Sequence, residues 1–209
     1  MRIIIPARKG SKGFPDKNLK LFEYTAMTIP DEYSDRVTVL TDDHRIQEIA
    51  EIRGFKWIGR PSEVSNDTAS TKSLVKWYID SHDIDELLVV LYLTYPERTW
   101  SDIEQAISLL KSSNSSSLLC KKEINSSPFL MLKEEGELHG SQLFYHDLYR
   151  RQDYPNCFEI SHYIIIINSK FINKLNNNLY CRDTVFMSVS KNVIDVDYEK
   201  NLSDLNGIP

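Results

Sequence analysis

The chain has 209 residues, of which 41% are hydrophobic and 26% are charged, and its formal net charge is -5. These values are typical of a globular protein with one sizeable core, and they indicate neither a disordered chain nor a membrane protein. One short cationic stretch near the N-terminus is too small for the extended basic face that binds a nucleic acid, so we expect no nucleic acid partner.

Apolar patterning divides the chain into alternating strands and helices. Runs typical of buried strands occur at residues 2–6, 37–41, 87–93, 117–120, 163–168 and 193–196. Helical spacing predicts helices at residues 44–53, 70–82 and 101–111, the last beginning at a capping box of Ser101 and Glu104, and a short first crossover helix within residues 22–30. This order predicts an α/β fold: a three-layer sandwich with a mostly parallel, Rossmann-like central sheet.

We expect a single domain over residues 1–209, with a small inserted hairpin subdomain at about residues 126–160. There the pattern changes to short extended pieces around a turn at Glu135 and Gly136. The residues alone allow a lid, a decorative hairpin or an interaction element.

Cysteines, histidines and the N-terminal residues bear on the compartment and on metals. The three cysteines are widely spaced and form no C-x-x-C pair, and the opening residues carry no signal-peptide pattern, so we expect a cytoplasmic protein. The five histidines show no zinc-site spacing.

A glycine-bearing cationic loop follows the first expected strand. Gly10 and Gly13 allow the backbone to turn its amide groups toward one point, where an anion binds. Only Asp16 opposes the cations of this stretch, which are Arg8, Lys9, Lys12, Lys17 and Lys20. The loop predicts a small phosphate-bearing ligand, although an ordinary solvated loop has a similar composition. The Walker and G-x-G-x-x-G patterns are absent from the sequence.

Residues 7–19 read A-R-x-x-S-K-G-x-P-x-K-N-L, which closely resembles the signature of the acylneuraminate cytidylyltransferase family. The resemblance implies that this loop holds the triphosphate of CTP through Arg8, Ser11, Lys12, Lys17 and Asn18. Among these, Arg8, Lys12 and Lys17 would stabilise the reacting phosphates.

A second motif, R-P-x-x-x-x-x-D-T-A-S, is matched by Arg60, Pro61 and residues 67–70. The resemblance implies that Arg60, Ala69, Ser70 and Thr71 contact the nucleotide. Asp67 has an alternative role as the N-cap of the helix that follows.

Near the C-terminus, Asp195 and Asp197 are two residues apart on an expected strand, so both carboxylates would face one side. Such a pair can hold a hard cation, or it can lie on a solvated edge. The segment is similar to the family's I-D-I-D pattern, which implies a Mg²⁺ site.

The acceptor side matches the family less well. Arg150 to Asp153 resemble the family's R-R-Q-D segment, which implies that Arg151 and Gln152 face a sugar acid, with the Arg151 fork on its carboxylate. Tyr92 stands where the family carries a sugar-contacting glutamine. Glu159 replaces an arginine, and we expect it to repel an acidic substrate, while Ser161 and His162 replace Asn-Gly.

The resemblance implies an enzyme that transfers CMP from CTP to a sialic acid-like nonulosonate, releases pyrophosphate and acts as a homodimer through its insertion. The alternatives are a cytidylyltransferase for a Kdo-type or other sugar acid, and a nucleotide-binding homologue without catalysis.

Overall fold

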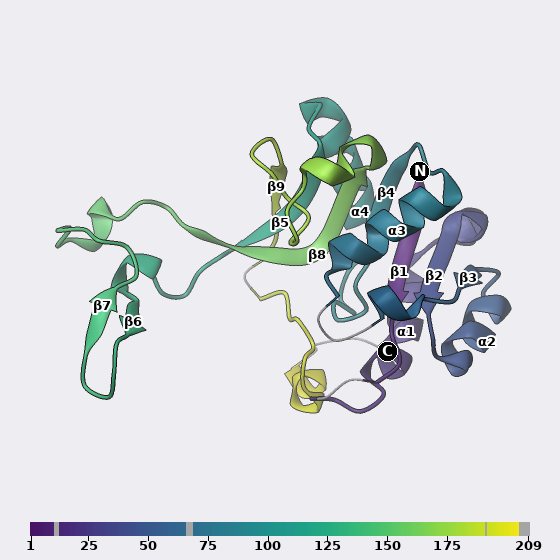
Figure 1. Cartoon of the computed structure of the whole chain (residues 1–209), viewed down its shortest axis with the longest axis horizontal. Helices are drawn as coiled ribbons and strands as arrows, with labels where there is room; N and C mark the ends of the chain where they lie inside the picture. The colour runs from purple at the N-terminus through teal and green to yellow at the C-terminus, as the bar shows by residue number, and fades with distance from the viewer. Residues whose placement is uncertain (11–12, 66–68, 191, 205–209) are drawn as a thin grey trace.

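The computed structural model describes residues 1–10, 13–65, 69–190 and 192–204. Its centre is a seven-stranded sheet in the order β3-β2-β1-β4-β8-β5-β9 (Figure 1). Six of the strands run parallel, and β8 runs antiparallel to both of its neighbours. The strands are β1 (Arg2–Ala7), β2 (Val37–Thr41), β3 (Lys56–Ile58), β4 (Leu87–Val90), β5 (Ser117–Glu123), β8 (Phe158–Asn168) and β9 (Val185–Ser188).

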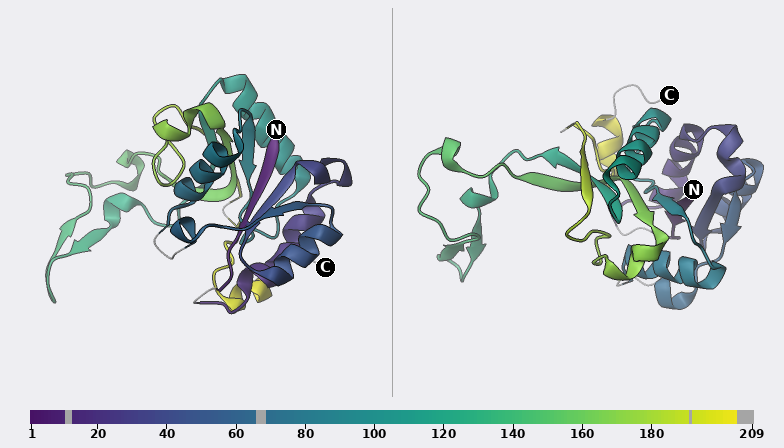
Figure 2. Two further views of the ribbon diagram at one scale, coloured as in Figure 1. Left: turned by 45° about the vertical axis from the view of Figure 1, so that its right-hand side comes forward. Right: turned by 90° about the horizontal axis from the view of Figure 1, so that it is seen from above.

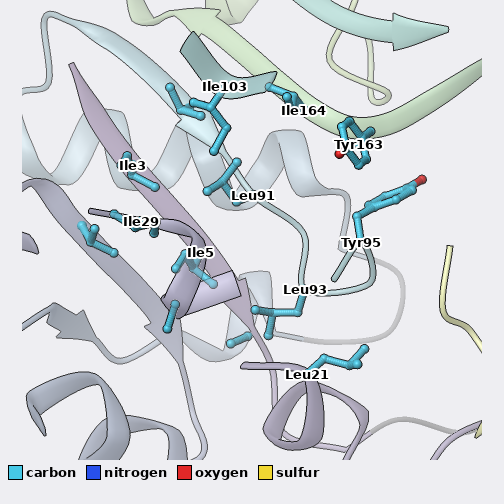
Figure 3. Close-up of a cluster of buried hydrophobic side chains, with 14 of the residues drawn as sticks. Ile3, Ile5, Leu21, Ile29, Leu91, Leu93, Tyr95, Ile103, Tyr163 and Ile164 are labelled. Carbon is cyan, nitrogen blue, oxygen red and sulfur yellow. The ribbon is translucent and has the colours of Figure 1, made fainter. Parts of the chain in front are cut away.

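Helices cover both faces of the sheet and form the outer two layers. On one face, Ile3 and Ile5 pack against α1 (Lys17–Thr28), α2 (His44–Ile52) and α4 (Trp100–Ser113), as the cluster in Figure 3 shows in part. On the other face, Ile4 packs against α3 (Thr71–His82) and the 3-10 helix η5 (Ser169–Lys174). Alternate β1 side chains therefore enter opposite layers, which is why β1 is a continuous apolar run. The predicted three-layer α/β fold is confirmed.

An arm projects from the body of the protein. The far ends of β5 and β8 run out from the sheet, and a small hairpin of β6 (Leu132–Glu134) and β7 (Gly140–Gln142) lies at the tip (Figures 1 and 2). The hairpin falls within the predicted insertion. The division of the chain into one domain with a dimerisation subdomain remains a prediction.

Several expected element boundaries are wrong. Residues 193–196 form no strand, because among the described residues this segment makes only one sheet-like bond, from the Val196 amide to the Thr94 carbonyl (2.8 Å). The capping box of α4 is formed by Thr99 and Asp102, two residues before the predicted pair. The first helix begins at Lys17 rather than within residues 22–30. Strands β3 and β9 are short edge strands that the sequence pattern did not reveal. In the described ranges no helix has the length and apolar character that a bilayer span requires.

Candidate active site

A cleft of about 280 Å³ opens at the carboxyl ends of β1 and β4, between the N-terminal ends of α1 and α3. Parallel sheets commonly bind ligands at this edge. The cleft brings together most of the predicted site residues: Arg8, Lys17, Asn18, Arg60, Ala69, Ser70, Thr71 and Tyr92. Its other lining residues are Pro6, Gly10, Leu74, Leu93 and Thr94, and of these the sequence singled out only Gly10, as a flexible turn residue.

Hydrogen bonds near its two ends hold the shape of the cationic loop that follows β1. Gly10 adopts a φ of 76°, a left-handed conformation that favours glycine. The Lys9 amide donates to Asp42 Oδ1 (2.5 Å), and Asn18 Nδ2 donates to the Arg8 carbonyl (2.9 Å). Asn18 therefore shapes the loop, and Asp42 at the end of β2 supports it. Ser11 and Lys12, which were predicted for the same site, lie outside the described residues.

Helix α1 begins beside the cleft after a left-handed Asp16 (φ 56°). Arg45 Nη2 bridges Asp16 and the buried Asp43, at 2.7 Å from each carboxylate, so this turn is tied to the start of α2. The first turn of α1 contains no acidic residue, and its free amide groups add positive potential at this end of the cleft. Lys17 lies in that turn and points its ammonium to Asp197 Oδ1 (2.8 Å).

Arg60 is a partly buried cation in the cleft wall. Its Nη2 donates to the Val64 carbonyl (2.6 Å), whereas its buried Nε has no partner among the described residues. Burial lowers the pKa of the Arg60 guanidinium; the negative charge of Asp42 opposes this shift and the positive charge of Arg8 adds to it. The cleft thus has a partly desolvated cation in its wall.

Helix α3 presents its N-terminus to the same cleft. Its N-cap is Ser70, whose Oγ accepts the Ser73 amide (3.1 Å), so the predicted N-cap Asp67 is wrong; Asp67 itself lies outside the described residues. Thr71, the first helical residue, accepts a hydrogen bond from the Tyr92 hydroxyl. The start of α3 is therefore attached to the segment that follows β4.

Tyr92 lines the cleft, and other aromatic side chains lie close to this part of the site. The ring of Tyr92 meets His162 edge to face, with centroids 5.7 Å apart. Burial raises the pKa of Tyr92 and lowers that of His162, so both groups are uncharged at neutral pH. Tyr95 donates its hydroxyl to Asp195 Oδ2 (2.9 Å), and burial raises its pKa strongly. Sequence reasoning noted His162 only as a departure from a motif.

Asp195 and Asp197 flank the buried Val196 in an extended segment rather than in a strand. Asp197 contacts Lys17 of the cleft, and Asp195 contacts the buried Tyr95. Among the described residues no group of three or more acidic, histidine or cysteine side chains is gathered as a metal site. Two carboxylates suit a Mg²⁺ ion that takes its remaining ligands from water and phosphate, so the donor set fits this ion.

The predicted sugar residues of the arm are not brought to the cleft. Arg151 and Gln152 lie in the exposed 3-10 helix η4 (Arg151–Asp153), and Arg151 lines a separate pocket of about 400 Å³ within the arm. Glu159 was expected to repel an acidic substrate, but its carboxylate pairs with Lys122 Nζ (3.6 Å), which offsets its charge.

A mostly parallel sheet with a cationic cleft at its carboxyl edge defines an α/β protein whose cleft suits a phosphate-bearing ligand. The cytidylyltransferase family model matches residues 2–162, and the chain belongs to this family.

Two N-acylneuraminate cytidylyltransferases are similar to the chain. That of Streptococcus agalactiae serotype V is 26% identical over 204 residues, covering 93% of this chain and 49% of that protein. That of Escherichia coli O18:K1:H7 is 34% identical over 113 residues, covering 51% of this chain and 27% of that protein. The chain spans about half the length of the S. agalactiae relative.

Solved structures share the fold. A CMP:2-keto-3-deoxy-manno-octonic acid synthetase complexed with CTP has a TM-score of 0.67 and 16% identity, with 97% of this chain and 95% of that chain covered. A 4-diphosphocytidyl-2C-methyl-D-erythritol synthase from Anaerococcus prevotii has a TM-score of 0.65 and 11% identity, with 97% and 94% covered.

Proposed function

We propose that this chain transfers CMP from CTP to an acidic, sialic acid-like nonulosonate sugar and releases pyrophosphate. The observation that carries the proposal is the cleft itself. Arg8, Lys17 and Arg60 line it between the starts of two helices, and no carboxylate is among its described lining residues. This charge pattern suits a polyanionic nucleotide.

The arrangement supports a specific orientation of CTP. The triphosphate would lie at the start of α1, against Arg8, Lys17 and the loop that includes Ser11 and Lys12. The nucleoside would lie against Arg60, Ala69, Ser70 and Thr71 at the start of α3. Asn18 would act by holding the Arg8 carbonyl and thus the shape of the loop.

Transfer requires the anomeric hydroxyl of the sugar to attack the α-phosphate in line. The new bond forms between that oxygen and the α-phosphorus. The bond between the α-phosphorus and the oxygen that bridges it to the β-phosphate breaks, and the hydroxyl loses its proton. Positioning and charge stabilisation supply most of the rate in such reactions. The cationic side chains of the cleft would stabilise the charge that develops on the α-phosphate and on the departing pyrophosphate.

Asp195 and Asp197 would hold a Mg²⁺ ion at the edge of the cleft. When bound, the ion would neutralise phosphate charge and help to orient the triphosphate. Lys17, which contacts Asp197, would then exchange part of this ion pair for phosphate oxygens.

The acceptor site would include Tyr92 from the cleft and Arg151 and Gln152 from an arm. Because Arg151 lies in a separate pocket of its own chain, we expect the arm of a second copy to complete the site, which requires a homodimer. Exposed apolar side chains on the arm support this, among them Leu143 and Phe144 at 50% and 49% exposure. We expect this dimer to act in the cytoplasm.

A second candidate function is nucleotide binding without transfer. It is favoured by the hydrogen bond that the Tyr92 hydroxyl donates to Thr71, because this hydroxyl is then not free to donate to a sugar acid. Pyrophosphate release from CTP and Mg²⁺ in the presence of a panel of sialic acid-like and Kdo-type acids separates the candidates. Release only with sialic acid-like acids supports the proposal, and release only with Kdo-type acids changes the acceptor class. CTP binding with no release for any acid refutes catalysis.

A further inference from the structure

Arg98 is a buried cation that the proposed transfer does not yet use. The residue is 3% exposed, and burial lowers its pKa to about 10, so its guanidinium remains protonated at neutral pH. The oxygens that it contacts are two backbone carbonyls and a hydroxyl rather than carboxylates, and its Nε has no partner in the described part of the chain. Burying a cation in this way is costly, so a specific geometric role is needed to explain it.

The guanidinium joins two strands at the point where their pairing stops. The β4–β8 ladder ends at the pair Val90 and Ile165, and the same register continued by two residues would pair Tyr92 with Tyr163. Arg98 lies there instead: Nη1 donates to the Tyr163 carbonyl (2.7 Å) and Nη2 to the Tyr92 carbonyl (3.1 Å). The planar fork of arginine suits two acceptors held at a fixed separation.

Strand β8 also changes its pairing with β5 at this place. The register between β5 and β8 shifts between Leu118 and Cys120, and beyond the shift β8 runs toward the arm (Figure 1). The carbonyls of the irregular stretch are bound by side chains: Tyr163 by Arg98, and Ile164 by the Cys120 thiol (3.6 Å). Figure 3 shows Tyr163 beside Tyr95 at this bend.

Arg98 also ties the bend to the helix that begins at the cleft. Nη2 donates to Thr25 Oγ1 of α1 (3.3 Å), and the Arg98 carbonyl accepts a hydrogen bond from Thr28 Oγ1 (3.1 Å). One side chain therefore links the end of β4, the bend of β8 and helix α1.

We propose that Arg98 is a positioning residue, which bridges the segment after β4 to the middle of β8 and so holds His162 against Tyr92, the side chain that lines the acceptor side of the cleft. Tyr92 and His162 come from these two diverging segments and meet at 5.7 Å between ring centroids. The guanidinium itself is buried, and Arg98 is not among the described residues that line the cleft. The role in transfer rests on the proposed function, whereas the role in holding the two segments does not.

Arg98→Lys keeps the charge and removes the fork, since one ammonium cannot hold both carbonyls in the same geometry. Thr25→Val is the matched control, because it removes a buried hydrogen bond to Arg98 and leaves the bridge between Tyr92 and Tyr163 intact. For R98K we expect the KM of the sugar acid to rise about tenfold or more while the KM of CTP stays within about threefold. For T25V we expect both values to stay within about threefold of the wild type, despite a lower melting temperature.

Hydrogen exchange provides a readout that needs no turnover. Backbone amides of residues 91–95 and 161–164 should exchange faster in R98K than in both T25V and the wild type. Exchange in R98K that matches T25V in both segments would overturn the proposal, and so would an equal rise in both KM values, which a general loss of stability produces. If the wild-type protein turns over no sugar acid, the proposed function fails, and the exchange comparison alone decides whether Arg98 holds the two segments.

Discussion

Arg60 offers a sharp test of the cleft, because a substitution there should affect binding far more than folding. Arg60→Met keeps the apolar stem of the side chain and removes the guanidinium. The folded protein loses the bond to the Val64 carbonyl (2.6 Å). It also no longer buries a cation whose pKa is lowered by desolvation and by Arg8. These effects oppose each other, so we expect the free energy of unfolding to change by only about 1 kcal/mol.

Binding should change more, because Arg60 is a cation in the lining of the cleft and an anionic nucleotide would contact its guanidinium. A hydrogen bond from a charged donor contributes about 1.5 to 3 kcal/mol. Since about 1.4 kcal/mol corresponds to a factor of ten, the Kd for CTP should rise roughly 10- to 150-fold. Isothermal titration with CTP and Mg²⁺ measures this value directly.

Arg53→Met is the matched control. Arg53 is paired with Glu23 (2.5 Å) and is not among the residues that line the cleft, so this variant should bind CTP like the wild type. If R60M binds CTP within about threefold of the wild type, or if R53M weakens binding as much as R60M, the reasoning about the cleft is wrong.

Three further predictions concern the ends of the cleft. In calorimetry, Lys17→Met should weaken CTP binding roughly tenfold and CMP binding much less. Lys20 lies on the same helix and has its own ion pair with Glu199, so Lys20→Met should change the binding of neither nucleotide. Burial holds the pKa of His162 below 6.5, so the unfolded chain takes up this proton more readily and the protein loses stability as the pH drops. In urea unfolding between about pH 7.5 and about pH 5.5, His162→Gln should lose less stability than the wild type. An equal loss of stability in the two proteins would contradict the assignment. Tyr92→Phe removes the bond to Thr71 and should lower the melting temperature by about 2 to 4 °C in calorimetry; an unchanged melting temperature would contradict a stabilising role for this bond.

The central elements of the fold could be predicted because their signals are local. Strand β2 and helix α3 follow from an apolar run and from apolar residues at helical spacing, and the structure has them at nearly the expected residues. The segment before Asp197 was read as a strand for the same local reason. Its apolar pattern reflects packing without sheet pairing, because Val196 is buried in the core and Val193 and Ile194 pack against the same cluster.

The sequence predicts the site residues that belong to a recognisable motif. It does not predict those whose role depends on tertiary contacts. Arg8 is far from Arg60 and Thr71 in the sequence, and the family resemblance points to all three, which line one cleft in the structure. The contacts of Arg98 could not be read from the sequence, because they depend on two carbonyls more than 60 residues apart. The register of β8 against its neighbours could not be read from the sequence.

The proposed transfer is tested most directly by following the α-phosphate of CTP. The protein is incubated with Mg²⁺, a nonulosonate acid and CTP that carries a radioactive α-phosphate, and the products are separated. We predict that the label appears on the sugar acid in an amount equal to the pyrophosphate released, and that R60M reduces both together. Label that remains in CTP with every sugar acid, although CTP binds, would contradict the proposed function.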